Sequence, residues 1–174
     1  MEPQTTTART ALKFGIISGV AGIVFISILY VSGQAANSSL AWLGSIITIA
    51  VMVLAMKEFR TLNGGFMTYG QGLGIGTLLS GISGFIGSVY SYIYQEFIDT
   101  TLRQQILDKV RDDLENRGMD DAQIEQALEM TQKFSSPGIT FAIGVIGSIF
   151  IGFIIALIIS AIMKKDKPFE MECY

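Results

Sequence analysis

The sequence contains no histidine and a single cysteine, Cys173, so the side chains that most often bind transition metals or act as general bases are nearly absent. One cysteine cannot form an internal disulfide, and its place in the chain does not fit a prenylation motif. Charged residues make up only 16% of the chain, and none lies in the four longest apolar blocks. Charges inside a membrane span usually mark proton relays and ion pathways. We therefore expect no catalytic residue, no metal site, no cofactor and no enzymatic activity.

Hydrophobic residues make up 50% of the 174 residues and are concentrated in four uncharged blocks, at 14–32, 40–56, 66–94 and 138–163. About 18 or more apolar residues in a row match the thickness of a bilayer's hydrocarbon core. The second block is at the short limit, and the third is long enough to extend beyond the membrane. The pattern predicts an all-α integral membrane protein of one domain, residues 1–174, with four transmembrane helices.

The orientation follows from the basic residues, because short cytoplasmic loops retain lysine and arginine. Seven basic residues flank the blocks on one side, namely Arg9, Lys13, Lys57, Arg60, Lys164, Lys165 and Lys167. The connection between the first two blocks has no charge, so we place it outside and both termini in the cytoplasm. Aromatic residues then cluster at the outer interface, where amphipathic rings prefer to sit: Tyr30, Trp42, Tyr90, Tyr92 and Tyr94.

A cleaved signal peptide is the alternative interpretation of the first block, because Gly33, Gln34 and Ala35 resemble a cleavage site after a basic start. Charge alone does not exclude it, since the three remaining spans would keep their orientation. The apolar run is longer than the roughly 7–15 residues of an ordinary signal. We therefore expect the mature chain to begin at or near Met1.

The segment 95–137 differs from the rest, with ten acidic residues against five basic ones and so a net charge of minus five. Its helix-period apolar positions predict an extramembrane helical hairpin between the third and fourth spans. Gly118 fits the residue just past a helix end, and Asp120 fits the cap of the next helix. Such a hairpin is too small to bury a sufficient core alone. We expect either a lid over the outer ends of the spans, in this chain or a second copy, or a docking surface for another envelope protein.

The third block carries small residues at four-residue spacing: Gly76, Ser80, Gly84 and Ser88. The fourth block repeats the arrangement with Gly144, Ser148 and Gly152. Small residues at this spacing let helix backbones approach closely in a membrane. We interpret all seven as helix-packing positions. Hydrogen bonds between helices would account for the few polar side chains in or near the third block, which are Thr68, Gln71, Thr77 and the tyrosine hydroxyls.

The alternative is that the glycine-rich third span is flexible or broken and lines a solute path. Gly70 and Gly72 resemble the start of the G-x-G-x-x-G motif of dinucleotide-binding loops. Such a loop is excluded, because Ile75 stands where the motif requires its third glycine and no strand precedes it. Two classes of function remain. The first is a non-catalytic membrane protein that assembles with itself or with another membrane protein, and the alternative is a small oligomeric transporter or pore. The acidic hairpin argues against a nucleic-acid partner.

The residues that open the third block, Tyr69, Gly70 and Gln71, together with the four spans and the acidic segment, resemble the bacterial membrane family called domain of unknown function 4199. The resemblance covers about residues 11–163. It implies a Gram-negative inner membrane and a periplasmic location for residues 95–137. The family has no established activity, so the resemblance assigns no catalytic or binding residue.

Overall fold

The computed structural model describes residues 6–33, 38–98, 102–134 and 136–166. Its elements are α1 (Thr7–Val31), α2 (Ser38–Leu62), α3 (Tyr69–Ile93), the π-helical turn η1 (Tyr94–Ile98), α4 (Leu102–Asn116), α5 (Asp121–Phe134) and α6 (Pro137–Met163). No strand occurs within these described ranges. The all-α class predicted from the sequence is therefore confirmed.

Four of the helices, α1, α2, α3 and α6, are long enough and apolar enough to cross a membrane. They correspond to the four apolar blocks, as the sequence predicts. The second helix is longer than its block, because α2 continues beyond residue 56 through Lys57 and Glu58 to Leu62. Lysine and glutamate are good helix formers as well as hydrophilic, so a helix can continue past the end of its apolar run.

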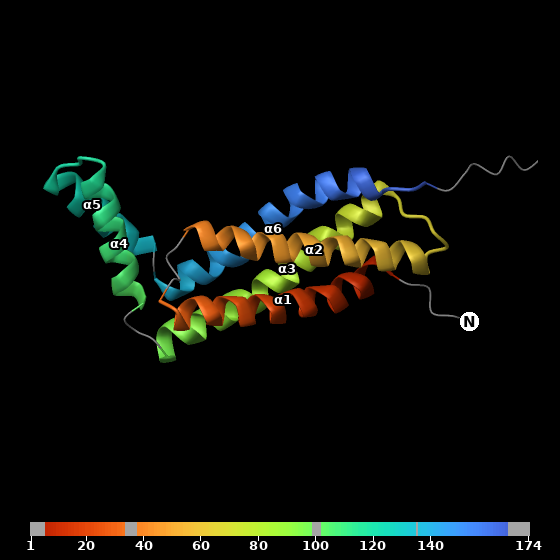
Figure 1. The fold of residues 1–174 in the computed structure, drawn as a ribbon, viewed down its shortest axis with the longest axis horizontal. Helices are drawn as coiled ribbons and strands as arrows, with labels where there is room; N and C mark the ends of the chain where they lie inside the picture. The colour runs from red at the N-terminus through yellow and green to blue at the C-terminus, as the bar shows by residue number, and fades with distance from the viewer. Residues whose placement is uncertain (1–5, 34–37, 99–101, 135, 167–174) are drawn as a thin grey trace, which may run out of the picture.

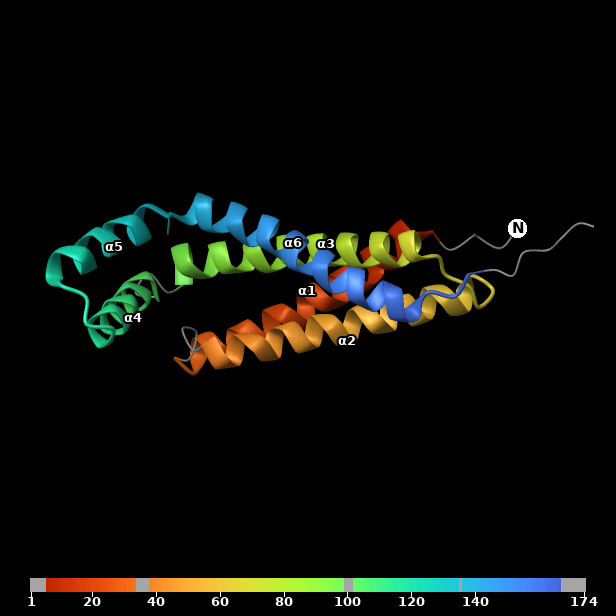
Figure 2. The same ribbon diagram turned by 90° about the horizontal axis from the view of Figure 1, so that it is seen from above.

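The four long helices lie side by side, with the described start of α1 and the last turn of α6 at the same end of the bundle (Figure 1). Lys13, Lys57 and Lys164 mark this end, which we call the basic end. Helix α3 is central, since it packs most extensively on α6 and on α1. Helix α2 packs mainly on α1, and in Figure 2 it lies apart from α6 over the half of the bundle away from the basic end.

The hydrophobic core is confined to the half of the bundle near the basic end. Its largest fully buried side chains are Phe59, Met52, Met56, Met67, Ile75 and Leu79. An antiparallel backbone bridge between Met67 and Lys165 ties the α2–α3 connection to the end of α6, with N–H···O distances of 2.9 and 2.8 Å. An ion pair of 2.7 Å between Lys13 and Glu58 joins α1 to α2 there. The bundle is therefore closed at its basic end.

Helices α4 and α5 pack on each other through Leu107, Ile124 and Leu128, which are buried in a small cluster of their own. Gly118 has a φ of +74°, so it does end α4 in the left-handed conformation that the sequence predicts. The Asp120 carboxylate accepts a hydrogen bond of 2.8 Å from the backbone N–H of Gln123, which confirms its role as a cap. The apolar positions predicted for the first helix of the hairpin include 102 and 106, whose side chains lie outside the described residues.

The α4–α5 pair lies beyond the ends of α3 and α6, and it shares no extensive contact with any described transmembrane helix (Figures 1 and 2). The prediction of a lid over the outer ends of the chain's own spans is therefore wrong. The physical reason is that Leu107, Ile124 and Leu128 bury themselves between the two helices. These three side chains are thus not available to hold the pair on the bundle.

Candidate functional site

Helices α3 and α6 approach each other closely along an antiparallel seam. Five pairs of small residues face each other along it, with each step of four residues along α3 matched by four residues back along α6. The pairs are Gly72 with Ser160, Gly76 with Ala156, Ser80 with Gly152, Gly84 with Ser148, and Ser88 with Gly144. In every pair at least one partner is a glycine.

The seam leaves no room for a side chain at its glycines. A Cβ built on Gly76 would lie 2.5 Å from the Cβ of Ala156, and one built on Gly144 would lie 2.6 Å from the Oγ of Ser88. A Cβ on Gly84 would overlap the side chain of Ser148. Because real Cβ contacts are longer than these distances, only glycine permits this helix separation.

The structure brings together all seven small residues that the sequence singles out at four-residue spacing. The set on α3 and the set on α6 face each other along this seam. Three further residues, Gly72, Ala156 and Ser160, extend the seam toward the basic end and were missed by the sequence interpretation. Continuing the four-residue spacing in both helices would have found them.

Helix α1 meets the opposite side of α3 in a different way. Here Gly15 and Gly19 receive bulky side chains, because a Cβ on Gly15 would lie 2.8 Å from the Cβ of Ile82 and one on Gly19 would lie 3.0 Å from Ile86. The α1–α3 contact therefore fits β-branched side chains into gaps left by glycines.

The residues that carry the family resemblance lie at the start of α3, at the basic end. Gln71 and Thr68 form a reciprocal capping box, in which the Gln71 N–H donates to the Thr68 Oγ1 at 3.3 Å and the Thr68 N–H donates to the Gln71 Oε1 at 2.9 Å. Tyr69 is the first helical residue, and a Cβ on Gly70 would meet nothing within 4 Å. The motif therefore begins helix α3, and its residues belong to none of the five pairs of the seam.

The expectation that polar side chains of the third span bond between helices holds only in part. Thr68 and Gln71 bond each other, and the Thr77 hydroxyl donates to the Leu73 carbonyl of its own helix at 2.8 Å. These side chains bond locally for one reason. Backbone groups three or four residues away in the chain are closer to them than any neighbouring helix is. The threonine three residues before Gln71 was the sequence signal for the capping box.

Tyrosine hydroxyls do connect helices, near the end of the bundle away from the basic end. The Tyr90 hydroxyl lies 2.6 Å from the Ser27 Oγ, and the Tyr30 hydroxyl donates to the Ser91 Oγ at 3.5 Å. The rings of Tyr30 and Tyr94 pack with their centroids 4.3 Å apart. This cluster joins α1 to α3 where the hydrophobic core is absent.

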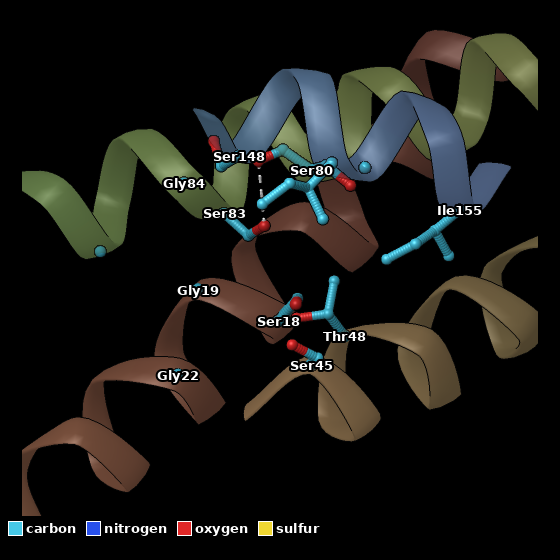
Figure 3. Close-up of a pocket in the computed structure, with 13 residues that line it drawn as sticks. Ser18, Gly19, Gly22, Ser45, Thr48, Ser80, Ser83, Gly84, Ser148 and Ile155 are labelled. Carbon is cyan, nitrogen blue, oxygen red and sulfur yellow. Dashed lines mark hydrogen bonds between the residues drawn. The ribbon is translucent and has the colours of Figure 1, made fainter. Parts of the chain in front are cut away.

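A cavity of about 220 Å³ lies among all four transmembrane helices (Figure 3). Five glycines, two isoleucines and six hydroxyl side chains line it, and the hydroxyls belong to Ser18, Ser45, Thr48, Ser80, Ser83 and Ser148. No lining residue is charged. Within the part of the chain that the structure describes, no three histidine, cysteine, aspartate or glutamate residues gather as metal ligands would. The chemistry that this site offers is hydrogen bonding by neutral groups.

Two serines of the seam, Ser148 and Ser80, also line the cavity, and the more deeply buried of them is Ser80. It is 2% exposed, and its hydroxyl has no hydrogen-bond partner among the described residues. Ser160, at the basic end of the seam, is likewise buried without a partner but does not line the cavity. Periodicity identifies Ser80 as a small seam residue, but it cannot show that four helices leave a space beside it.

No curated protein and no solved structure matches the chain. The sequence model of the family described as protein of unknown function (DUF4199) matches residues 13–165, which include the four long helices and the α4–α5 pair. By this match over most of its length, the chain belongs to the DUF4199 family.

Proposed function

We propose that this protein is a non-catalytic, multi-pass component of the bacterial inner membrane that assembles with another membrane or envelope protein through its α4–α5 pair. In this proposal both termini are cytoplasmic and residues 95–137 are periplasmic. The observation that carries it is an exposed apolar surface on a projecting element. Met130 and Phe134 of α5 are each 59% exposed, although the pair already buries a core of its own.

The composition of α4 and α5 supports a protein partner over other partners. Methionine and aromatic side chains are enriched in protein interfaces and are unfavourable in water. The net charge of minus five over residues 95–137 disfavours nucleic acid and anionic lipid headgroups. A partner surface with an apolar centre and a basic rim would complement both properties.

The small-residue faces of the transmembrane helices support the same choice of surface. The face of α3 that carries Gly84 and the face of α6 that carries Ser148 are occupied by each other. Neither of these two faces is free for a second copy or a partner helix.

The test is complex formation in mild detergent by the wild type and by a Met130→Gln variant, with Gln126→Ala on the same helix as a matched control. Light scattering after size exclusion gives the mass of the complex, and mass spectrometry gives its stoichiometry. Truncation of an interface anchor typically costs more than about 1 kcal/mol, so we expect about a tenfold weaker complex for Met130→Gln and no change for Gln126→Ala. A stoichiometric complex unaffected by Met130→Gln, or a lone monomer for the wild type, would contradict the proposal.

The second candidate function is a small oligomeric transporter or pore, and the hydroxyl-lined cavity is the observation that favours it. Four spans of one chain enclose little space, so a path through the membrane would require several copies or a change of conformation. The absence of charge from the lining restricts such a path to neutral solutes. Flux of small neutral solutes into vesicles that contain the purified protein tests this candidate, and impermeable vesicles would exclude it.

A further inference from the structure

The basic end of the bundle carries more positive charge than its own carboxylates offset. Among the described residues, the carboxylates there are those of Glu58 and Asp166, against six cationic side chains, which gives a net charge of plus four. The cations are those of Arg9, Lys13, Lys57, Arg60, Lys164 and Lys165. Lys13 forms an ion pair with Glu58. None of the other five cations pairs with a carboxylate of the described ranges.

The paired carboxylate serves one side of helix α2 only. Glu58 faces α1, because its carboxylate lies 2.7 Å from the Lys13 ammonium. Arg60 is two residues further along α2, so it points about 200° around the helix axis from Glu58 and away from α1. Lys57 is three residues before Arg60, a spacing that makes two side chains neighbours on a helix surface. Lys57 and Arg60 therefore share a side of α2 where the cations have no counter-ion from α1.

Two backbone contacts hold the end of α6 to the connection that follows α2. The Gly65 N–H donates to the Arg60 carbonyl at 2.8 Å, and Met67 and Lys165 exchange N–H···O hydrogen bonds of 2.9 and 2.8 Å. Only Phe66 lies between Gly65 and Met67 in the chain, and its ring centroid is 5.9 Å from the Lys165 Nζ, a cation–π distance. The cations that end α2 and α6 are therefore carried close together on a fixed backbone.

These cations lie where lipid headgroups lie. Lys57 directly follows Met56, at the end of one apolar block, and Lys164 directly follows the last residue of α6. The hydrocarbon core ends with the apolar blocks, so the headgroup phosphates of the same leaflet lie at this level. Leu54 of α2 is 54% exposed and Ile162 of α6 is 78% exposed, each within one helical turn of these lysines. Acyl chains thus have apolar surface beside the cations.

We propose that the unpaired cations at the ends of α2 and α6 bind the headgroup of an anionic phospholipid in the adjacent leaflet. The binding surface consists of Lys57, Arg60, Lys164 and Lys165. The lipid phosphate supplies there the negative charge that Glu58 supplies to Lys13 on the α1 side. A zwitterionic lipid binds more weakly, because its own ammonium group offsets its phosphate. This surface requires neither a partner on α4 and α5 nor passage of a solute across the membrane.

The test is the binding of dioleoyl phosphatidylglycerol and dioleoyl phosphatidylcholine to the full-length protein in mild detergent, measured by native mass spectrometry. The two lipids share their acyl chains, so a difference in affinity reports the headgroup. Each basic residue near an anionic lipid surface is worth about a fivefold gain in affinity. We therefore expect phosphatidylglycerol to bind at least about tenfold more tightly than phosphatidylcholine. Equal affinities would overturn the proposal.

Two pairs of substitutions locate the surface. Lys57→Gln with Arg60→Gln should weaken phosphatidylglycerol binding by roughly 30-fold, because two cations are lost, and should leave phosphatidylcholine binding unchanged. Lys164→Gln with Lys165→Gln should have the same effect and repeats the test in case the first pair disturbs folding. If neither pair weakens phosphatidylglycerol binding in protein that elutes as the wild type does, the proposal fails.

Two matched controls separate this surface from the effect of charge in general. Lys13→Gln with Glu58→Gln removes a cation together with its counter-ion at the same end, and the affinity for phosphatidylglycerol should stay unchanged. Arg111→Gln with Arg117→Gln removes two positive charges from the acidic segment, and again no change is expected. If this second control weakens binding as much as Lys57→Gln with Arg60→Gln does, the attraction depends on net charge alone and the proposed surface is wrong.

A competition experiment distinguishes a lipid from a soluble anion. Inorganic phosphate in excess should not displace phosphatidylglycerol, because it lacks the acyl chains that pack on the apolar surface beside the cations. Displacement by inorganic phosphate would show a site for free anions and would overturn the assignment to a phospholipid.

Discussion

The seam between α3 and α6 permits a sharp test in which two facing residues are exchanged. Gly84 on α3 faces Ser148 on α6, and a Cβ at position 84 would overlap the Ser148 side chain. Gly84→Ser should therefore force the two helices apart. Ser148→Gly in the same chain removes the obstructing side chain and should restore the contact.

The magnitude follows from the geometry. Overpacking of a close contact typically costs about 1–3 kcal/mol, which is the expected loss for Gly84→Ser alone. Ser148→Gly alone should cost roughly 0.5–1 kcal/mol, mainly because glycine is a poor helix former. In the double variant the overlap is absent, so the two effects should not add, and the interaction energy should be about 1–3 kcal/mol in favour of the pair.

The assay is the free energy of unfolding in mixed detergent micelles for the wild type, both single variants and the double variant. Gly74→Ser is the matched control on the same helix, because a Cβ at Gly74 would meet nothing within 4 Å. Ile82 is a less suitable control position, since its side chain packs against Gly15. Gly74→Ser should be close to neutral and should combine additively with Ser148→Gly, to within about 0.5 kcal/mol.

Two outcomes would refute the packing argument. If Gly84→Ser and Gly74→Ser destabilise the protein equally, the seam is not close-packed at this position. If Ser148→Gly fails to rescue Gly84→Ser, these two residues do not face each other. In either case the glycines of α3 would more reasonably serve helix flexibility, and the transporter candidate would gain support.

Three further predictions test other parts of the description. A phosphatase reporter, active only outside the cytoplasm, should be active when fused after residue 118 and inactive after residue 62, and activity after residue 62 would contradict the topology. Intact-mass measurement should find that helix α1 is retained in the purified protein, whereas loss of about the first 35 residues would show that the first span is a cleaved signal. Replacement of Glu58 by Gln should cost at most about 1 kcal/mol of unfolding free energy, because its ion pair with Lys13 is partly exposed to water. A larger loss that persists in high salt would show a structural role for Glu58 beyond that pair.

Local features of this protein follow directly from its sequence. The left-handed Gly118 and the Asp120 cap depend on residues within a few positions of each other, so their sequence pattern is sufficient. The four long helices follow from uninterrupted apolar blocks for the same reason. The capping box of Thr68 and Gln71 was equally local, and it was missed only because both residues were assigned to contacts between helices.

The four-residue spacing of small residues determines which residues share one face of one helix. It does not determine which helix lies opposite that face, because every span here carries small residues. The structure pairs α3 with α6 through facing small side chains and α3 with α1 through Ile82 and Ile86. That choice depends on how side chains of different helices fill space together, which no single helix encodes.

The position of the α4–α5 pair and the central cavity were decided by the tertiary structure alone. The sequence predicts an acidic, amphipathic helical hairpin over residues 95–137, and it leaves open whether the apolar side chains of the hairpin cover the bundle or each other. The cavity is bounded by side chains from four helices far apart in the chain, including Ser18, Thr48, Ser80 and Ser148. A hydroxyl at any one of these positions is ordinary in a membrane helix. Only the arrangement of the four helices, in which α2 lies apart from α6 over the half away from the basic end, leaves a space where these hydroxyls meet.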